Sequence, residues 1–125
     1  MNIKSMELAW IVVADIKEAK KFFTETVGLK LVEEHDQYGW LEFEGYQGGM
    51  RLGVGQYSPE YSADDKPGMN AVMSMTVDNL ETAQHEMQQK GVRFIGEVME
   101  VPGQVKMATF VDKDNNKFQL VQKLS

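Results

Sequence analysis

The chain has 125 residues, enough for one domain with a single hydrophobic core and too few for two cores of ordinary size. Apolar residues make up 42% of the sequence and charged residues 26%, which excludes a disordered or fibrous protein. The formal net charge of −6 disfavours nucleic acid and anionic membranes as partners and favours neutral or cationic ones.

Cysteine is absent, so the chain has no disulfide, no thiolate nucleophile and no cysteine ligand for a metal. The longest apolar run near the start, residues 8–14, is too short to span a membrane, and no small-residue cleavage site follows it. We therefore expect a cytoplasmic protein that does not bind membranes.

In the first half, an apolar stretch at residues 6–13 predicts a strand, and the helix after it begins at Asp15, with Glu18 in its first turn. The apolar residues of this helix recur at helical spacing, and Gly28 can end it. Short alternating stretches then predict three strands, at residues 29–33, 40–43 and 51–54.

Residues 57–68, "YSPEYSADDKPG", carry two prolines and no apolar period, which is typical of a connector. The same order of elements then recurs. A strand is predicted at residues 71–77, and a helix follows that Asn79 can cap and Gly91 can end. Three more strands are predicted near residues 92–95, 107–110 and 118–121.

The two halves align with each other. A shift of 64 residues superimposes Asp15 on Asn79, and a shift of 67 superimposes Phe43 on Phe110. The sequence therefore predicts one α+β domain made of two βαβββ repeats, at about residues 1–56 and 69–125, joined by the connector at about 57–68. We expect the repeats to pair into a curved mixed sheet with a central cavity, with one helix per repeat on the outer face.

The segments "AWIVVADIKEAKKFFTETVGLKL" and "VMSMTVDNLETAQHEMQQKGVRF", with the ending "FVDKDNNKFQLVQ", resemble the vicinal oxygen chelate superfamily. This superfamily includes glyoxalase I, fosfomycin-resistance enzymes, extradiol dioxygenases and bleomycin-resistance binding proteins. The resemblance implies a paired βαβββ fold that is often dimeric. It also implies, for the enzymes, one divalent metal held by a His or Gln on the first strand of each repeat and a Glu on the last.

Carried onto this sequence, the resemblance places the first-strand ligands at Leu8 and Val72, seven residues before Asp15 and Asn79. The last-strand positions are Gln119 and, 67 residues earlier, Leu52. Three of these four side chains are aliphatic, whereas a catalytic metal needs about three protein donors. We therefore expect no metal, no other cofactor and no catalytic residue.

Three other patterns have simpler explanations than function. His35 lies beside Glu33, Glu34 and Asp36 and could act as a base or a ligand, but charged residues at the end of a strand are usually just solvated. The stretch "HEMQQ" at His85 lacks the second histidine of a zinc-protease motif. The stretch "DKDNNK" lacks the glycine and the glutamate of a calcium loop and predicts a hairpin turn.

Strand alternation predicts which side chains line the cavity, if Ile11, Val13, Leu41 and Phe43 pack beneath the helices. The expected lining residues are Leu8, Trp10, Val12, Trp40, Glu42, Glu44, Leu52, Val54, Val72, Ser74, Met107, Thr109, Gln119 and Val121. This mixture of apolar surface and sparse polar groups is typical of a small-molecule pocket. Trp10 and Trp40 could stack on a flat ring or hold a cation, which Glu42 could neutralise.

The sequence therefore favours a metal-independent protein that binds a small aromatic or cationic molecule, in the manner of the bleomycin-resistance proteins, as a homodimer. One alternative is a metal-dependent lyase or dioxygenase of the glyoxalase type, with ligands at other positions. Another is a dimeric partner-binding protein whose own side chains fill the cavity.

Overall fold

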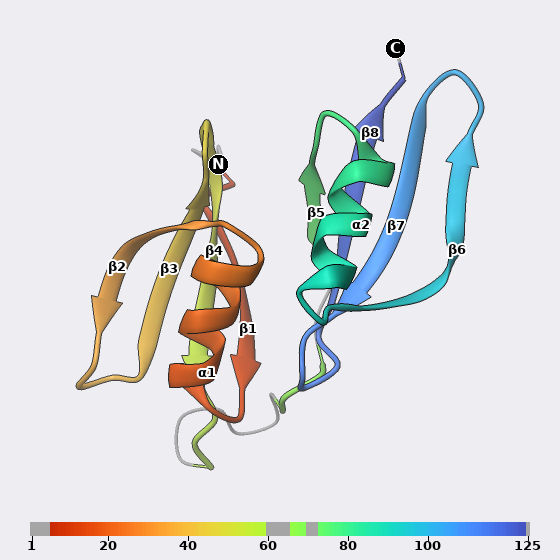
Figure 1. Cartoon of the computed structure of the whole chain (residues 1–125). Helices are drawn as coiled ribbons and strands as arrows, with labels where there is room; N and C mark the ends of the chain where they lie inside the picture. The colour runs from red at the N-terminus through yellow and green to blue at the C-terminus, as the bar shows by residue number, and fades with distance from the viewer. Residues whose placement is uncertain (1–5, 60–65, 70–72, 125) are drawn as a thin grey trace. The chain divides into compact units, whose positions relative to one another are not determined.

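A computed structural model describes residues 6–59, 66–69 and 73–124, and the chain divides into two compact units, Met1–Met69 and Asn70–Ser125. Each unit contains a four-stranded mixed sheet and a helical segment that begins after the first strand (Figure 1). The predicted α+β fold of two βαβββ repeats, with one helix in each, is confirmed. No helix in the described part of the chain is long and apolar enough to cross a membrane.

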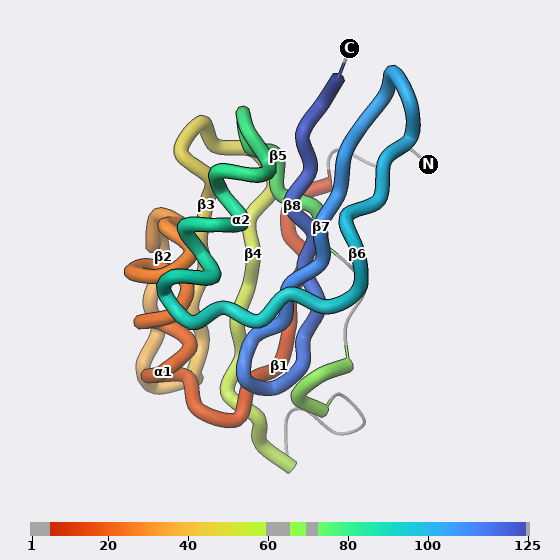
Figure 2. Tube along the Cα trace, turned by 45° about the vertical axis from the view of Figure 1, so that its right-hand side comes forward, coloured from red at the N-terminus to blue at the C-terminus, as the bar shows by residue number. Residues whose placement is uncertain are grey.

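The first unit contains β1 (Leu8–Val13), α1 (Ile16–Lys21) continued by a π-helical segment η1 (Phe22–Thr26), β2 (Lys30–His35), β3 (Trp40–Gly45) and β4 (Gly48–Gln56). Its strands lie in the order β1-β4-β3-β2, which can be followed in Figure 2. β1 runs parallel to β4, and the other neighbours are antiparallel.

The second unit contains β5 (Met73–Thr76), α2 (Leu80–Gln89), β6 (Arg93–Val101), β7 (Val105–Val111) and β8 (Lys117–Lys123). The strand order, β5-β8-β7-β6, repeats that of the first unit, and β5 is again parallel to the last strand (Figure 2). The described residues of the predicted connector, 57–59 and 66–68, lie outside all helices and strands.

Both helices begin and end where the sequence predicts. Asp15 accepts hydrogen bonds from the backbone N–H of Lys17 and Glu18, and Asn79 accepts one from the N–H of Thr82. Gly28 and Gly91 follow the helices with φ of 88° at each, a left-handed conformation that glycine adopts without steric cost.

A glutamine from the last strand of each unit also holds the start of the helix. The Gln56 side-chain oxygen accepts a hydrogen bond from the backbone N–H of Ile16 at 2.8 Å, and Gln122 accepts one from Leu80 at 2.8 Å. Both bonds satisfy a helix N-terminal N–H that has no partner within the helix. The two glutamines therefore occupy equivalent positions in the repeats.

The core of the first unit lies between its sheet and its helical segment. Phe23 of η1 packs against Phe43 of β3 with ring centroids 5.5 Å apart, and neither side chain is exposed. The other buried residues on this side of the sheet alternate along β1, β3 and β4: Ile11, Val13, Leu41, Leu52 and Val54. Burial of these apolar side chains against the helix fixes which face of the sheet remains uncovered by it.

The second unit has an equivalent core. Phe110 of β7 stacks on Phe118 of β8 with ring centroids 5.4 Å apart, and Leu80 of α2 is fully buried. Ala108 and Leu120 continue this side of the sheet in register with each other. Leu80 and Met87, seven residues apart and so on one side of the helix, are the buried residues of α2.

The turn between β7 and β8 is built on a buried polar pair. The Asp112 carboxylate accepts hydrogen bonds from the backbone N–H of Asp114 and Asn116 and, at 2.8 Å, from the Asn116 side-chain amide. Asn115, between them, has φ of 66°, which confirms that the segment is a turn tolerating a positive φ. Burial raises the pKa of Asp112 and outweighs the opposing effect of the hydrogen bonds from Asn116.

This raised pKa predicts a pH dependence that Asp112→Asn should remove. Because the folded state holds the proton more tightly, the contribution of Asp112 to the free energy of unfolding is fully present below its ordinary pKa of 3.8 and is lost as pH rises through the higher folded value. We expect the unfolding free energy of the wild type, minus that of the variant, to fall as pH rises through this window. Urea denaturation of both proteins across acidic pH measures the difference, and an increase with pH would contradict the raised pKa.

Candidate functional site

The face of the first sheet that points away from α1 carries two tryptophans and a cluster of charges. The strand register pairs Trp10 with Gly53, Trp40 with Gly55 and Glu42 with Gly53, so these side chains share one face. We call this surface the tryptophan face, and it consists of Leu8, Trp10, Glu33, His35, Trp40, Glu42, Glu44 and Arg51, with Gly53 and Gly55.

Trp40 lies flat on the sheet because β4 has no side chains beneath it. A Cβ atom added at Gly53 would lie 2.5 Å from Cζ2 and 2.6 Å from Cη2 of the Trp40 ring, far inside contact distance. At Gly55 the added atom would lie 3.4 Å from Cε3, an ordinary van der Waals contact. The pair of glycines therefore forms a floor for the indole, and Gly53 is the more constrained of the two.

The second indole stands beside the first. The ring centroids of Trp10 and Trp40 are 5.9 Å apart and their planes are tilted by 58°, an arrangement within the preferred range for aromatic pairs. The Trp10 side chain is 46% exposed, so part of an apolar ring faces solvent. An aromatic pair of this kind, with one ring exposed, can stack on a flat ligand or contact a cation.

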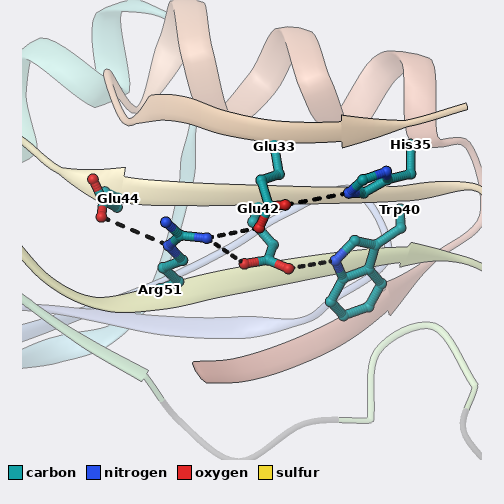
Figure 3. Close-up of polar contacts among 6 residues, drawn as sticks. All are labelled: Glu33, His35, Trp40, Glu42, Glu44 and Arg51. Atoms are coloured by element: carbon teal, nitrogen blue, oxygen red, sulfur yellow. Dashed lines mark hydrogen bonds and ion pairs between the residues drawn. The ribbon is translucent and has the colours of Figure 1, made fainter. Parts of the chain in front are cut away.

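Glu42 connects the tryptophans to a chain of charged groups, shown in Figure 3. One carboxylate oxygen accepts a hydrogen bond from the Trp40 indole N–H at 2.8 Å, and the other accepts one from Nη1 of Arg51 at 3.0 Å. The same Nη1 lies 2.7 Å from Glu33, while Nε of Arg51 lies 3.6 Å from Glu44. One guanidinium thus contacts three carboxylates, and these four groups carry a formal charge of −2.

These contacts shift the pKa values of the groups involved. The Trp40 indole N–H and then Arg51 stabilise the ionised carboxylate and lower the pKa of Glu42, against the effect of burial. The hydrogen bond to Glu42 raises the pKa of Arg51. Glu42 is therefore an anion at neutral pH, placed directly beside the ring of Trp40.

His35 lies at the edge of this cluster. Its Nε2 is 3.4 Å from a carboxylate oxygen of Glu33, and its ring centroid is 6.3 Å from that of Tyr38. The side chain is 40% exposed, as expected for a residue at the end of a strand. His85 is exposed on α2, as the helical spacing predicts.

The expected lining residues of the second repeat share a face of the second sheet. Thr109 pairs with Gln119, Ser74 pairs with Gln119, and Met107 pairs with Val121. The Ser74 hydroxyl donates a hydrogen bond to the Gln119 carboxamide oxygen at 3.3 Å. These expected lining side chains are uncharged, unlike Glu42 and Glu44 on the tryptophan face, and Val72 lies outside the described residues.

The expectation that Leu52 and Val54 point the same way as the tryptophans is wrong. Leu52 pairs with Phe43 and Val54 pairs with Leu41, so both side chains lie beneath the helix, with exposures of 3% and 0%. Gln119 pairs with Thr109, the counterpart of Glu42, and Glu42 pairs with Gly53. On the last strands the repeats are therefore offset by 66 residues and not by the predicted 67. The equivalence of Gln56 and Gln122 shows the same offset, and the counterpart of Gln119 is Gly53.

Sequence reasoning missed Arg51, Gly53 and Gly55 because of this one-residue error. Alternation along "RLGVGQ" does carry the signal, since burying Leu52 and Val54 sends Arg51 and both glycines to the other face. Glu33 lies on the same face as Arg51 and the two glycines for a different reason. A bulge in β2, between Leu31 and Glu33, shifts the register so that Glu33 and His35 lie opposite Glu42 and Trp40.

The described residues at the family's ligand positions do not fit a divalent metal. Leu8 has no donor atom, Gly53 has no side chain, and the single carboxamide of Gln119 already accepts a hydrogen bond from Ser74. Over the described part of the chain, no three side chains of His, Asp or Glu are grouped so that they could hold a metal ion.

The glycine floor predicts a difference between two matched variants. Gly53→Ala should lower the free energy of unfolding by about 1–3 kcal/mol and displace Trp40 from Glu42, because the new methyl group overlaps the indole. Gly55→Ala, with its looser contact, should have the smaller effect. Urea denaturation and the NMR shift of the Trp40 indole N–H measure both, and equal effects of the two substitutions would contradict the proposed floor.

Comparison with known proteins supports this fold over the whole chain. Residues 5–120 match the family described as the Glyoxalase/Bleomycin resistance protein/Dioxygenase superfamily. The chain is 29% identical to the uncharacterized protein YetH of Bacillus subtilis (strain 168), with 94% of this chain and 98% of YetH covered.

Two solved structures are also similar. One is a superfamily member from Sphaerobacter thermophilus DSM 20745, with 23% identity, a TM-score of 0.81 and coverage of 97% of this chain and 98% of that one. The other is TnmS3, an antibiotic binding protein from Streptomyces sp. CB03234, with 25% identity, a TM-score of 0.80 and coverage of 98% of both chains. The match of the family and the shared fold show that the chain belongs to the Glyoxalase/Bleomycin resistance protein/Dioxygenase superfamily.

Proposed function

We propose that this protein binds a small aromatic or cationic molecule on the tryptophan face without the help of a metal ion. The observation that carries the proposal is the Trp10 and Trp40 pair, a partly exposed aromatic surface with an anionic carboxylate hydrogen-bonded to one of its rings. Stacking on such a pair contributes roughly 0.5–1.5 kcal/mol beyond area burial, and a cation over an indole contributes about 0.5–2 kcal/mol.

The rigidity of the tryptophan face favours binding further. The glycine floor holds Trp40 from below, and its hydrogen bond to Glu42 fixes the direction of the ring. A ligand therefore meets an aromatic surface that is already ordered, so that little side-chain entropy is lost on binding. Leu8 adds apolar surface on the same face.

Binding without chemistry accounts best for the residues present. The described ligand positions of the family offer one neutral carboxamide, and the charged groups of the tryptophan face are engaged with one another. TnmS3, an antibiotic binding protein of similar fold, supports a binding role for this chain. We also propose that Ser74, Met107, Thr109 and Gln119 are ligand-binding residues of the second unit, that the protein acts as a homodimer, and that it is cytoplasmic.

Ligand binding should depend on Trp40. In a tryptophan-fluorescence screen of aromatic and cationic compounds, we expect at least one saturable ligand, for which Trp40→Ala lowers the affinity about tenfold or more as stacking and the ordered carboxylate are lost. The affinity is measured by calorimetry. Tyr46→Ala is the matched control, because Tyr46 is a 98% exposed aromatic residue outside the tryptophan face. An equal loss in both variants would argue against this site.

Metal independence has its own test. We expect the purified protein to contain no stoichiometric divalent metal, and its melting temperature and ligand affinity to be the same with added nickel or zinc as with a chelator. Elemental analysis and thermal denaturation measure these quantities. A retained metal ion that stabilises the protein would instead favour a glyoxalase-type lyase or dioxygenase.

A further inference from the structure

The position of Arg51 suggests how the tryptophan face selects its ligand. Its guanidinium holds the place beside Glu42 where the positive group of a ligand lying on Trp40 would sit. We propose that Arg51 is an internal competitor for this place, and that the ligand is a flat ring carrying a permanent positive charge, which displaces Arg51 from Glu42. This inference rests on the function proposed above and names the chemical class of its ligand.

Arg51 can leave Glu42 without losing its other ion pairs. Arg51 shares one nitrogen, Nη1, between Glu33 at 2.7 Å and Glu42 at 3.0 Å, and its Nε faces Glu44 at 3.6 Å. If Arg51 withdraws from Glu42, it still contacts two carboxylates. Because its side chain is 35% exposed, this movement requires no rearrangement of the core.

The Glu42 carboxylate is already oriented to pair with a cationic ligand. One of its oxygens stays bound to the Trp40 indole N–H when Arg51 leaves, so that the carboxylate keeps its orientation. Its side chain is 17% exposed, the least among the three glutamates, so an ion pair formed here is screened less by solvent. Electrostatic attraction at this position is therefore stronger than at Glu33 or Glu44.

Charge also argues against an anionic ligand. Glu33, Glu42 and Glu44 all lie around the single guanidinium of Arg51, so the carboxylates outnumber it three to one. An anion placed on Trp40 would meet the Glu42 carboxylate directly. A neutral ring would gain the stacking contribution alone.

The test uses three probes of nearly one shape: N-methylquinolinium, neutral quinoline and quinoline carboxylate. The chain has two tryptophans, so its NMR spectrum has two indole N–H signals, which Trp10→Phe assigns. Calorimetry gives each affinity, and the shifts of the two indole signals show whether the probe is at the tryptophan face. In the wild type, we expect N-methylquinolinium to bind most tightly and the carboxylate least.

The deciding variant is Arg51→Met, which keeps an unbranched apolar stem of similar length to that of arginine and removes the charged guanidinium end. We expect N-methylquinolinium to bind about fivefold more tightly to it at low salt, since removal of a competing unit charge near 4 Å changes the interaction by about this factor in water. Binding of neutral quinoline, which does not compete with the charge of Arg51, should change much less than that of N-methylquinolinium. Lys20→Met is the matched control, because it breaks an ion pair with Glu34 and changes the net charge equally, without involving the tryptophan face.

A second variant, Glu42→Gln, keeps the inference testable if Arg51→Met unfolds. Its carboxamide oxygen can still accept the Trp40 N–H, so N-methylquinolinium should lose most of its advantage over quinoline and keep only the contribution of its charge over the indole ring. If Arg51→Met weakens or does not alter N-methylquinolinium binding while quinoline still shifts both indole signals, the competitor role is wrong and the binding function stands. If no probe shifts either indole signal, both the inference and the proposed function fail.

Discussion

The tryptophan face depends on the absence of two side chains. Gly53 and Gly55 let the Trp40 ring lie directly on β4, where the Glu42 carboxylate can accept its indole N–H at 2.8 Å. That bond orients Glu42, and Glu42 in turn helps to hold Arg51. A side chain at Gly53 would remove the first contact and with it the order of the others.

The two repeats share one fold but differ in the side chains on the sheet face that is turned away from the helix. Asp15 and Asn79 cap the helices in the same way, and Gln56 and Gln122 hold the helix starts with equivalent bonds. On the faces turned away from the helices, charged and aromatic residues in the first unit stand where Ser74, Met107, Thr109 and Gln119 stand in the second. The core contacts that specify the fold leave this face free to vary, so that one repeat can acquire a binding surface.

Much of the fold could be predicted because its signals are local. Asp15 and Gly28 mark the limits of the first helical segment through hydrogen bonds and a left-handed φ that involve only neighbouring residues. The candidate site was predicted less completely. Trp10, Trp40 and Glu42 were identified, whereas a one-residue error in the last strand exchanged Leu52 for Gly53, since alternation reverses with every residue.

The sequence alone determined the family, the two βαβββ repeats and the aliphatic residue Leu8 at a position where the family's enzymes hold a metal. Only the tertiary structure decided that the bulge in β2 brings Glu33 to the same face as Glu42 and that Arg51 lies between them. Capping and periodicity act over a few residues and can be read along the chain. Strand register and side-chain contacts join residues far apart in sequence, and they are fixed only when the sheet forms.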